Sequence, residues 1–268
     1  MTHSMQTKYS FPKLRKFNIV MGFLHLGQAV AVWLLANDSS LPITTNYLNP
    51  DPTNQSFGTS LEVIANIEIA PLIVVFLILS ATAHFFVSLP QGYNWYVSNL
   101  QKERNYARWY EYALSSSVMI IIIALLCGIY DLGSLILIFI LNASMNLFGL
   151  LAEQYNSLQK EVYPDRKANW TAFIFGCVAG IVPWIVLGLY FFTAISRASE
   201  AVPVPDFVYA IFYSLFIFFN IFALNMWLQY KQIGPWKNYI YGERMYVILS
   251  LVAKSALAWQ VFGGTLRG

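Results

Sequence analysis

The sequence predicts an all-α membrane protein built as a bundle of seven transmembrane helices. Its 268 residues are 57% hydrophobic and only 11% charged, with a mean hydropathy of +0.54, which is more apolar than one soluble core can hide. Seven apolar stretches reach the roughly 20 residues that cross a hydrocarbon layer about 30 Å thick. The net charge of +3 is small, and no basic soluble segment is present, so nucleic-acid binding is excluded.

The apolar stretches form the elements of one domain that spans residues 1–268, since we find no internal repeat. We expect helices at about 17–36, 64–88, 100–130, 133–155, 170–195, 205–230 and 242–262. The first stretch follows a basic segment, as the apolar region of a signal peptide does. It is longer than the 7–15 residues of such a region and contains His25 and Gln28, so we expect it to remain as a helix.

The loop between the first two helices, residues about 37–60, contains no Lys or Arg. Residues 41–48 have an extended pattern, and residues 49–54 are rich in Asn, Pro and Asp. An extended run that leads into a cluster of turn residues predicts a short β-hairpin in this loop.

The basic residues predict the orientation of the helices, because Lys and Arg are enriched in cytoplasmic loops. Thirteen lie in the N-terminal segment and in alternate loops: Lys8, Lys13, Arg15, Lys16, Lys102, Arg104, Arg108, Lys160, Arg166, Lys167, Lys231, Lys237 and Arg244. The opposite side has only Arg197 and Arg267. We therefore expect a multi-pass protein of the cell membrane, in contact with the lipid bilayer, with its N-terminus cytoplasmic and its C-terminus external.

Lys254 is the most informative ionisable residue inside a predicted helix. It lies ten residues after Arg244, or about 15 Å along the helix axis, which is too deep for its amine to reach water easily. A charge at this depth costs several kcal/mol and indicates a functional site. Lys254 is either the lysine of a structural or ion-transport ion pair or a lysine that condenses with an aldehyde to form a Schiff base.

Glu111 is the best candidate for the counter-ion that a buried cation needs. If the third helix begins near Leu100, Glu111 lies about 16 Å along it, at the depth of Lys254. Ser115 and Ser116 follow Glu111 by about one turn, and Ser250 precedes Lys254 by one turn. Their hydroxyls are suited to bonding the carboxylate or a bound molecule, although a helix interface of small residues explains them equally well.

Two histidines, His25 and His84, lie at similar depths in the first two helices. They are either hydrogen-bonded core residues or a pair that accepts a proton near neutral pH. No third ligand with suitable spacing is present, so we expect no metal site. Glu68 lies three residues before Pro71, and we expect it near the external interface.

Several long stretches resemble the heliorhodopsins, a family of microbial-rhodopsin relatives with inverted membrane orientation. These stretches are Arg108–Met119, Asn142–Met145, Gly176–Trp184, Phe218–Leu224, Gly242–Arg244 and Leu249–Gln260. The resemblance extends over essentially the whole chain.

The resemblance implies a rhodopsin-like bundle with covalently bound all-trans retinal on Lys254 and Glu111 as its counter-ion. It places Ser250 and Ser116 near the Schiff base, Trp184 and Phe219 at the walls of the retinal pocket, and Trp109 and Asn142 close to it. It assigns His25, His84, Ser80 and Gln28 to a polar, proton-accepting cluster on the cytoplasmic side. It also implies a homodimer.

The third helix favours light sensing over pumping, because residues 118–126 continue from the serines as a purely apolar run, whereas a pump needs a polar path on both sides of the Schiff base. We expect a photoreceptor that signals through an unknown cytoplasmic partner. The alternatives are a light-driven or light-gated proton transporter, and a transporter or intramembrane enzyme in which Lys254 and Glu111 are only an ion pair. The sequence contains no nucleophile elbow, phosphate loop or zinc motif, so we expect no enzyme.

Overall fold

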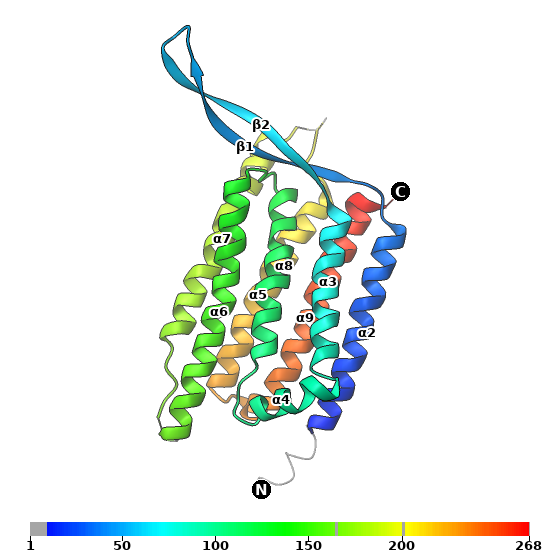
Figure 1. Cartoon of the computed structure of the whole chain (residues 1–268), viewed down its shortest axis with the longest axis vertical. Helices are drawn as coiled ribbons and strands as arrows, with labels where there is room; N and C mark the ends of the chain where they lie inside the picture. The colour runs from blue at the N-terminus through cyan, green and yellow to red at the C-terminus, as the bar shows by residue number, and fades with distance from the viewer. Residues whose placement is uncertain (1–9, 164–165, 200–201, 268) are drawn as a thin grey trace.

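The computed structural model describes residues 10–163, 166–199 and 202–267. It contains seven helices that are long and apolar enough to cross a membrane, so the predicted fold class is confirmed. They are α2 (Phe11–Leu35), α3 (Ile69–Phe86), α5 (Tyr106–Leu126), α6 (Leu132–Val162), α7 (Thr171–Arg197), α8 (Asp206–Tyr230) and α9 (Tyr239–Val261). The short helices α4 (Pro90–Leu100), η1 (Gly234–Lys237) and η2 (Phe262–Leu266) complete the helical part. Figure 1 shows the N-terminal end of α2 and the C-terminal end of the chain at opposite ends of the bundle.

The starts of three helices follow from short polar side chains that cap free backbone N–H groups. Asn105 accepts a hydrogen bond from the Arg108 N–H and begins α5. Asp131 and Asn238 do the same for α6 and α9. The start of each of these helices is therefore set by its own sequence.

The predicted hairpin is present, but it is longer than the sequence indicated. Strands β1 (Ser40–Asp51) and β2 (Ser56–Glu68) pair antiparallel along their whole length and project beyond the bundle (Figure 1). Consequently α3 begins at Ile69, not at residue 64, because the apolar residues before it pair with β1. Glu68 lies at the junction of β2 and α3, and Thr44 N–H bonds the Tyr130 carbonyl at 2.9 Å, which holds the hairpin to the α5–α6 loop.

The expected single helix at 100–130 is wrong, since the chain turns between α4 and α5. Glu103 has a φ of 55° in this turn, a backbone conformation that ends a right-handed helix. The adjacent charged residues Lys102 and Arg104 lie in the same turn, and α4 runs across the end of the bundle (Figure 1). Glu111 therefore lies only about one and a half turns into α5, although it still reaches Lys254.

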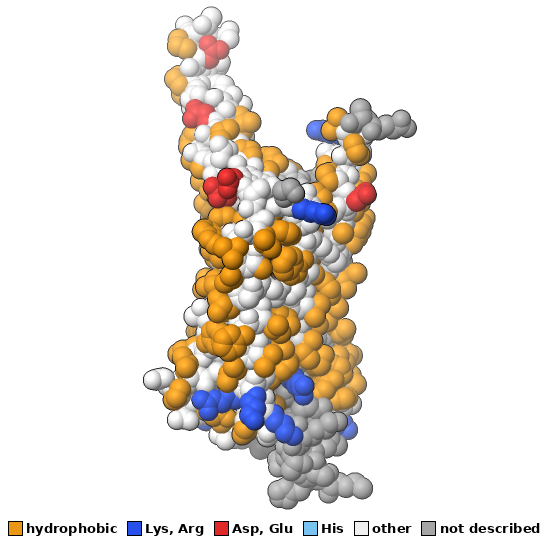
Figure 2. Space-filling model, turned by 90° about the vertical axis from the view of Figure 1, so that its right-hand side faces the viewer, with side chains coloured by type: hydrophobic (Ala, Val, Ile, Leu, Met, Phe, Trp, Pro, Cys, Tyr) orange, Lys and Arg blue, Asp and Glu red, His pale blue; other side chains and the backbone are white. Residues whose placement is uncertain are grey.

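The largest cluster of buried apolar residues fills the half of the bundle nearer the hairpin. It includes Ile73 of α3, Ile120 and Ile123 of α5, and Leu257 of α9, all with no exposed surface. The opposite end of the bundle carries most of the Lys and Arg side chains, and acidic side chains occur on the hairpin (Figure 2). Of the basic residues used to predict orientation, Lys8 lies outside the described residues.

Candidate functional site

Lys254 and Glu111 form a buried ion pair in the middle of the bundle. The Lys254 Nζ lies 2.7 Å from Glu111 Oε1 and 2.9 Å from the Ser250 Oγ. The two charged side chains are only 3% and 8% exposed. Helices α9 and α5 thus bring together two groups that are separated by 143 positions in the sequence.

A second donor, from another helix, bonds the same Glu111 oxygen as Lys254. Ser80 of α3 donates from its hydroxyl to Glu111 Oε1 at 2.6 Å, and Ser80 is 1% exposed. The resemblance implies a place for Ser80 in the polar cluster, and the structure places it directly on the carboxylate. Hydrogen bonds to an ionised oxygen stabilise its charge, so Glu111 is held as an anion by two different helices.

The serines of α5 have separate surroundings. The Ser116 Oγ accepts hydrogen bonds from Asn142 Nδ2 at 2.8 Å and Asn146 Nδ2 at 3.1 Å, both on α6. Ser115 is fully buried, and Ser115 and Ser116 both line a cavity beside Lys254. Sequence reasoning did not identify Asn146, although it lies one helical turn after Asn142 on α6, and that spacing was the available signal.

Two adjoining cavities share several lining residues, and one of them lies beside Lys254. Both are lined by Tyr112, Met145, Asn146, Phe219 and Phe222. The first also reaches Lys254, and the second reaches Trp109. A mostly apolar, aromatic-lined space with a few polar groups is the usual form of a site for an organic cofactor.

Glycine and tryptophan residues shape the walls of this space. A Cβ atom added at Gly149 would lie 2.3 Å from the Trp109 ring, so only glycine leaves room for that indole. Trp184, which the resemblance places in the pocket wall, lines neither cavity; its ring packs edge-on against the lining residue Phe219 at 5.4 Å between centroids. Retinal, a long apolar aldehyde, is compatible with these residues because the cavity joins an aromatic wall to a buried amine with a carboxylate partner.

The histidines form a stacked pair, and only part of the expected polar cluster gathers around them. The His25 and His84 rings lie 5.6 Å apart and nearly parallel, and His84 Nδ1 lies 2.9 Å from Asn18 Oδ1. Gln28 does not join them: its amide bonds the Leu24 carbonyl and the Trp259 indole. Among the described residues, no group of three potential ligands is arranged to hold a metal.

Sequence reasoning missed a second buried charge cluster, near the basic end of the bundle. Arg108 forms ion pairs with Glu153 of α6, at 2.7 Å, and with Glu243 of α9. Glu153 also accepts from the Trp109 indole at 2.7 Å and from the Tyr239 hydroxyl at 2.9 Å. The charge pattern assigned Arg108 to a loop, so its burial was not expected; two acidic residues on other helices were the only available signal.

The Arg108 guanidinium is enclosed by aromatic rings as well as by carboxylates. Its central carbon lies 3.9 Å from the centroid of the Tyr246 ring and 4.6 Å from that of the Trp109 ring. Such stacking stabilises a desolvated guanidinium. The cluster connects α5, α6 and α9 on the basic-end side of the Lys254 site. Trp109 contacts Arg108 in this cluster and also lines the second cavity.

A buried lysine–carboxylate pair among seven membrane helices, beside an aromatic cavity, is the arrangement of a rhodopsin-type membrane protein. The heliorhodopsin family model matches residues 14–266. The chain therefore belongs to the heliorhodopsin family, and it is a light-sensing membrane protein of the rhodopsin type. A search of the curated proteins finds no match.

Proposed function

We propose that this chain is a retinal photoreceptor in which Lys254 carries all-trans retinal and Glu111 is the counter-ion. The observation that supports this most strongly is the 2.7 Å ion pair between two almost fully buried side chains. Condensation of the lysine amine with the retinal aldehyde forms a C=N bond and releases water. The protonated product keeps one positive charge, so the same carboxylate neutralises it.

The chain's own residues hold the charge and shape the cavity. Ser80 donates to the carboxylate and Ser250 accepts from the amine, which fixes the distance between the two charges. Tyr112, Phe219 and Phe222 line the cavity beside Lys254, and Trp109 lines the adjoining one. Trp184 and Asn142 line neither cavity and contact the lining residues Phe219 and Ser116. Bound retinal supplies light absorption and isomerisation, while the protein supplies electrostatics and restricts motion.

A sensory role is favoured by the contrast between the two sides of Lys254. Beyond the serines, Met119 to Leu125 of α5 are almost all fully buried in the apolar cluster, with no polar side chain among them. Towards the basic end lie His84, Asn18 and the Arg108 cluster. Along α5, a proton that leaves the site therefore has polar neighbours towards the basic end only. The alternative, a light-driven or light-gated proton transporter, needs a polar path on both sides.

The orientation proposed for the membrane follows the positive-inside rule. The basic end of the bundle, with the N-terminal end of α2, faces the cytoplasm, and the hairpin and C-terminal end face outward. A homodimer and a cytoplasmic signalling partner are part of the same proposal. The signal would leave through the cytoplasmic loops, where the Arg108 cluster links the retinal cavity to three helices.

The decisive experiment is a visible absorption spectrum of the protein expressed with all-trans retinal. We expect a visible band in the unaltered protein, no band in Lys254→Ala, and a shifted band in Glu111→Gln. Lys13→Ala, a change at an exposed lysine on α2, is the control and should leave the band unchanged. Absence of a band in correctly folded unaltered protein would mean that Lys254 is only an ion-pair lysine.

Transport is tested separately, by recording pH changes in illuminated suspensions of cells or vesicles that contain the protein. A sensor produces no sustained light-dependent proton movement. A sustained movement that is abolished in Lys254→Ala would support the transporter alternative.

A further inference from the structure

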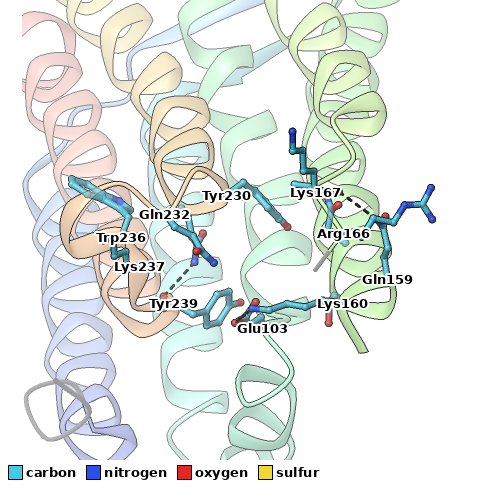
Figure 3. A pocket seen from close by; sticks show the side chains of 14 residues that line it. Glu103, Gln159, Lys160, Arg166, Lys167, Tyr230, Gln232, Trp236, Lys237 and Tyr239 are labelled. Atoms are coloured by element: carbon cyan, nitrogen blue, oxygen red, sulfur yellow. Dashed lines mark hydrogen bonds and ion pairs between the residues drawn. The ribbon is translucent and has the colours of Figure 1, made fainter. Parts of the chain in front are cut away.

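A pocket of about 290 Å³ opens at the basic end of the bundle, outside the retinal site. It lies between the end of α6, the segment before α7 and the connection from α8 to α9. Figure 3 shows Lys160 extending toward Glu103 and Tyr239, with Arg166 and Lys167 at one rim and Trp236 and Lys237 at the other. The volume is at the lower limit for small-molecule sites.

The charges around this pocket favour an anion. Four basic side chains line it, and among the lining residues that the structure describes Glu103 is the one carboxylate. Lys160 pairs with Glu103 at 2.7 Å. The other three, Arg166, Lys167 and Lys237, have no ion-pair partner among the described residues. Cations around a concave surface raise the positive electrostatic potential inside it more than scattered charges do, which attracts anions.

The uncharged lining residues indicate that the ligand carries an apolar or hydrogen-bonding group in addition to its charge. Tyr230, Trp236 and Tyr239 contribute aromatic surface. The Gln159 Oε1 atom lies buried in the wall and has no hydrogen-bond partner among the described residues. A buried acceptor without a partner costs free energy, which a hydroxyl or amine donor on a ligand would recover.

We propose that this pocket binds an oxyanion-bearing ligand, with a phosphate or carboxylate held by Arg166, Lys167 and Lys237. The oxyanion belongs either to a small soluble molecule or to the headgroup of an anionic lipid, since the pocket lies at the end of the membrane helices. Arginine and lysine recognise both through charge-assisted hydrogen bonds.

The pocket is joined to the retinal cavity by a short chain of hydrogen bonds. Tyr239 lines the pocket and donates to Glu153 at 2.9 Å, and Glu153 accepts from the Trp109 indole at 2.7 Å. Trp109 lines the cavity that leads to Lys254. We therefore expect occupancy of the pocket to change the photoreceptor's absorption or photocycle. This coupling rests on the proposed function, whereas the binding itself does not.

Binding is measured by calorimetric titration of pyrophosphate into retinal-free protein in phosphatidylcholine nanodiscs at constant ionic strength. The double variant Lys167→Gln/Lys237→Gln should weaken binding at least about tenfold, which corresponds to roughly 1.4 kcal/mol. The control, Lys13→Gln/Lys16→Gln, removes the same charge from exposed positions on α2 and should leave binding unchanged. Equal weakening in both double variants, or no binding to unaltered protein, overturns the proposal.

The lipid and soluble sources are distinguished by repeating the titration in nanodiscs that contain phosphatidylglycerol. Loss of pyrophosphate binding there, restored by diluting the anionic lipid, identifies a headgroup as the occupant. Unchanged binding identifies a soluble ligand. If only an acidic protein segment binds and neither pyrophosphate nor anionic lipid does, the proposal is wrong.

The coupling is tested with Tyr239→Phe, which keeps the aromatic wall but removes the hydroxyl that bonds Glu153. In retinal-loaded protein, pyrophosphate should shift the visible band or change the photocycle rate, and Tyr239→Phe should lose this response while still binding pyrophosphate. Binding without any visible response in unaltered protein disproves the coupling alone. Binding in the absence of a visible band would count against the proposed function and leave the pocket assignment intact.

Discussion

The two halves of the bundle on either side of Lys254 are built from different interactions. The half nearer the hairpin is a dry apolar core of α3, α5 and α9, with residues such as Ile73, Ile123 and Leu257 fully buried. The half nearer the basic end buries an arginine and two glutamates and contains the partly buried Asn18–His84 pair. Along α5, charge rearrangement at the Lys254–Glu111 pair therefore has polar partners towards the basic end only, which is what a one-sided signal needs.

The largest effect is expected from breaking the charge cluster of the basic half. Arg108→Gln leaves two buried carboxylates without their cation, and it should lower the free energy of unfolding by roughly 3–5 kcal/mol. Thermal or SDS-induced unfolding of retinal-loaded protein measures this. Lys160→Gln is the control: Lys160 and its partner Glu103 have side chains that are 48% and 43% exposed, so its loss should cost about 1 kcal/mol or less. Equal effects would contradict the contrast between a buried and an exposed ion pair.

A substitution in the dry half should lower the free energy of unfolding of the protein without changing its absorption maximum. Ile123→Ala opens a cavity in the apolar core and should cost roughly 2–5 kcal/mol, with the absorption maximum unchanged because Ile123 lines neither retinal cavity. The matched variant is Leu137→Ala, since Leu137 is 70% exposed on the bundle surface and should lose little. A large spectral shift in Ile123→Ala would show that the dry half also tunes the chromophore.

Ser80→Ala should have the opposite effect, with a small decrease in the free energy of unfolding and a clear shift of the absorption maximum. The variant removes one hydrogen bond from the Glu111 carboxylate, at a cost of roughly 1 kcal/mol. On the proposed function, the negative charge then acts more strongly on the protonated Schiff base, so we expect an absorption maximum at shorter wavelength. Ser144→Ala, whose hydroxyl bonds only the Ile140 carbonyl, is the control. An unchanged spectrum would mean that Ser80 does not tune the counter-ion.

The smallest effect concerns a thiol at the end of the dry half. Burial raises the pKa of Cys127 to about 12, so at pH 8 almost none of it is the reactive thiolate. A Cys177→Ser variant, which removes the exposed cysteine, should resist alkylation by iodoacetamide at pH 8 until the protein is unfolded. Labelling of the folded variant would show that water reaches this half.

Local sequence predicted the features that depend on neighbouring residues. Apolar runs identified seven helices, turn residues identified the hairpin, and the isolated positions of Lys254 and Glu111 singled out one pair of charges. The break between α4 and α5 was missed because hydropathy averages over the turn at Glu103. The length of the hairpin was missed because apolar residues before Ile69 fit a strand and a helix equally well.

The sequence by itself determined that this chain crosses a membrane seven times and carries one lysine too deep to be solvated. Only the tertiary structure decided what surrounds that lysine: that Ser80 bonds the carboxylate, that Gln28 faces away from the histidines, and that Arg108 is buried between Glu153 and Glu243. The physical reason is that hydropathy and helix capping act between residues close in the chain. Ion pairs and hydrogen bonds between helices depend on how those helices are rotated and packed, which no single segment specifies.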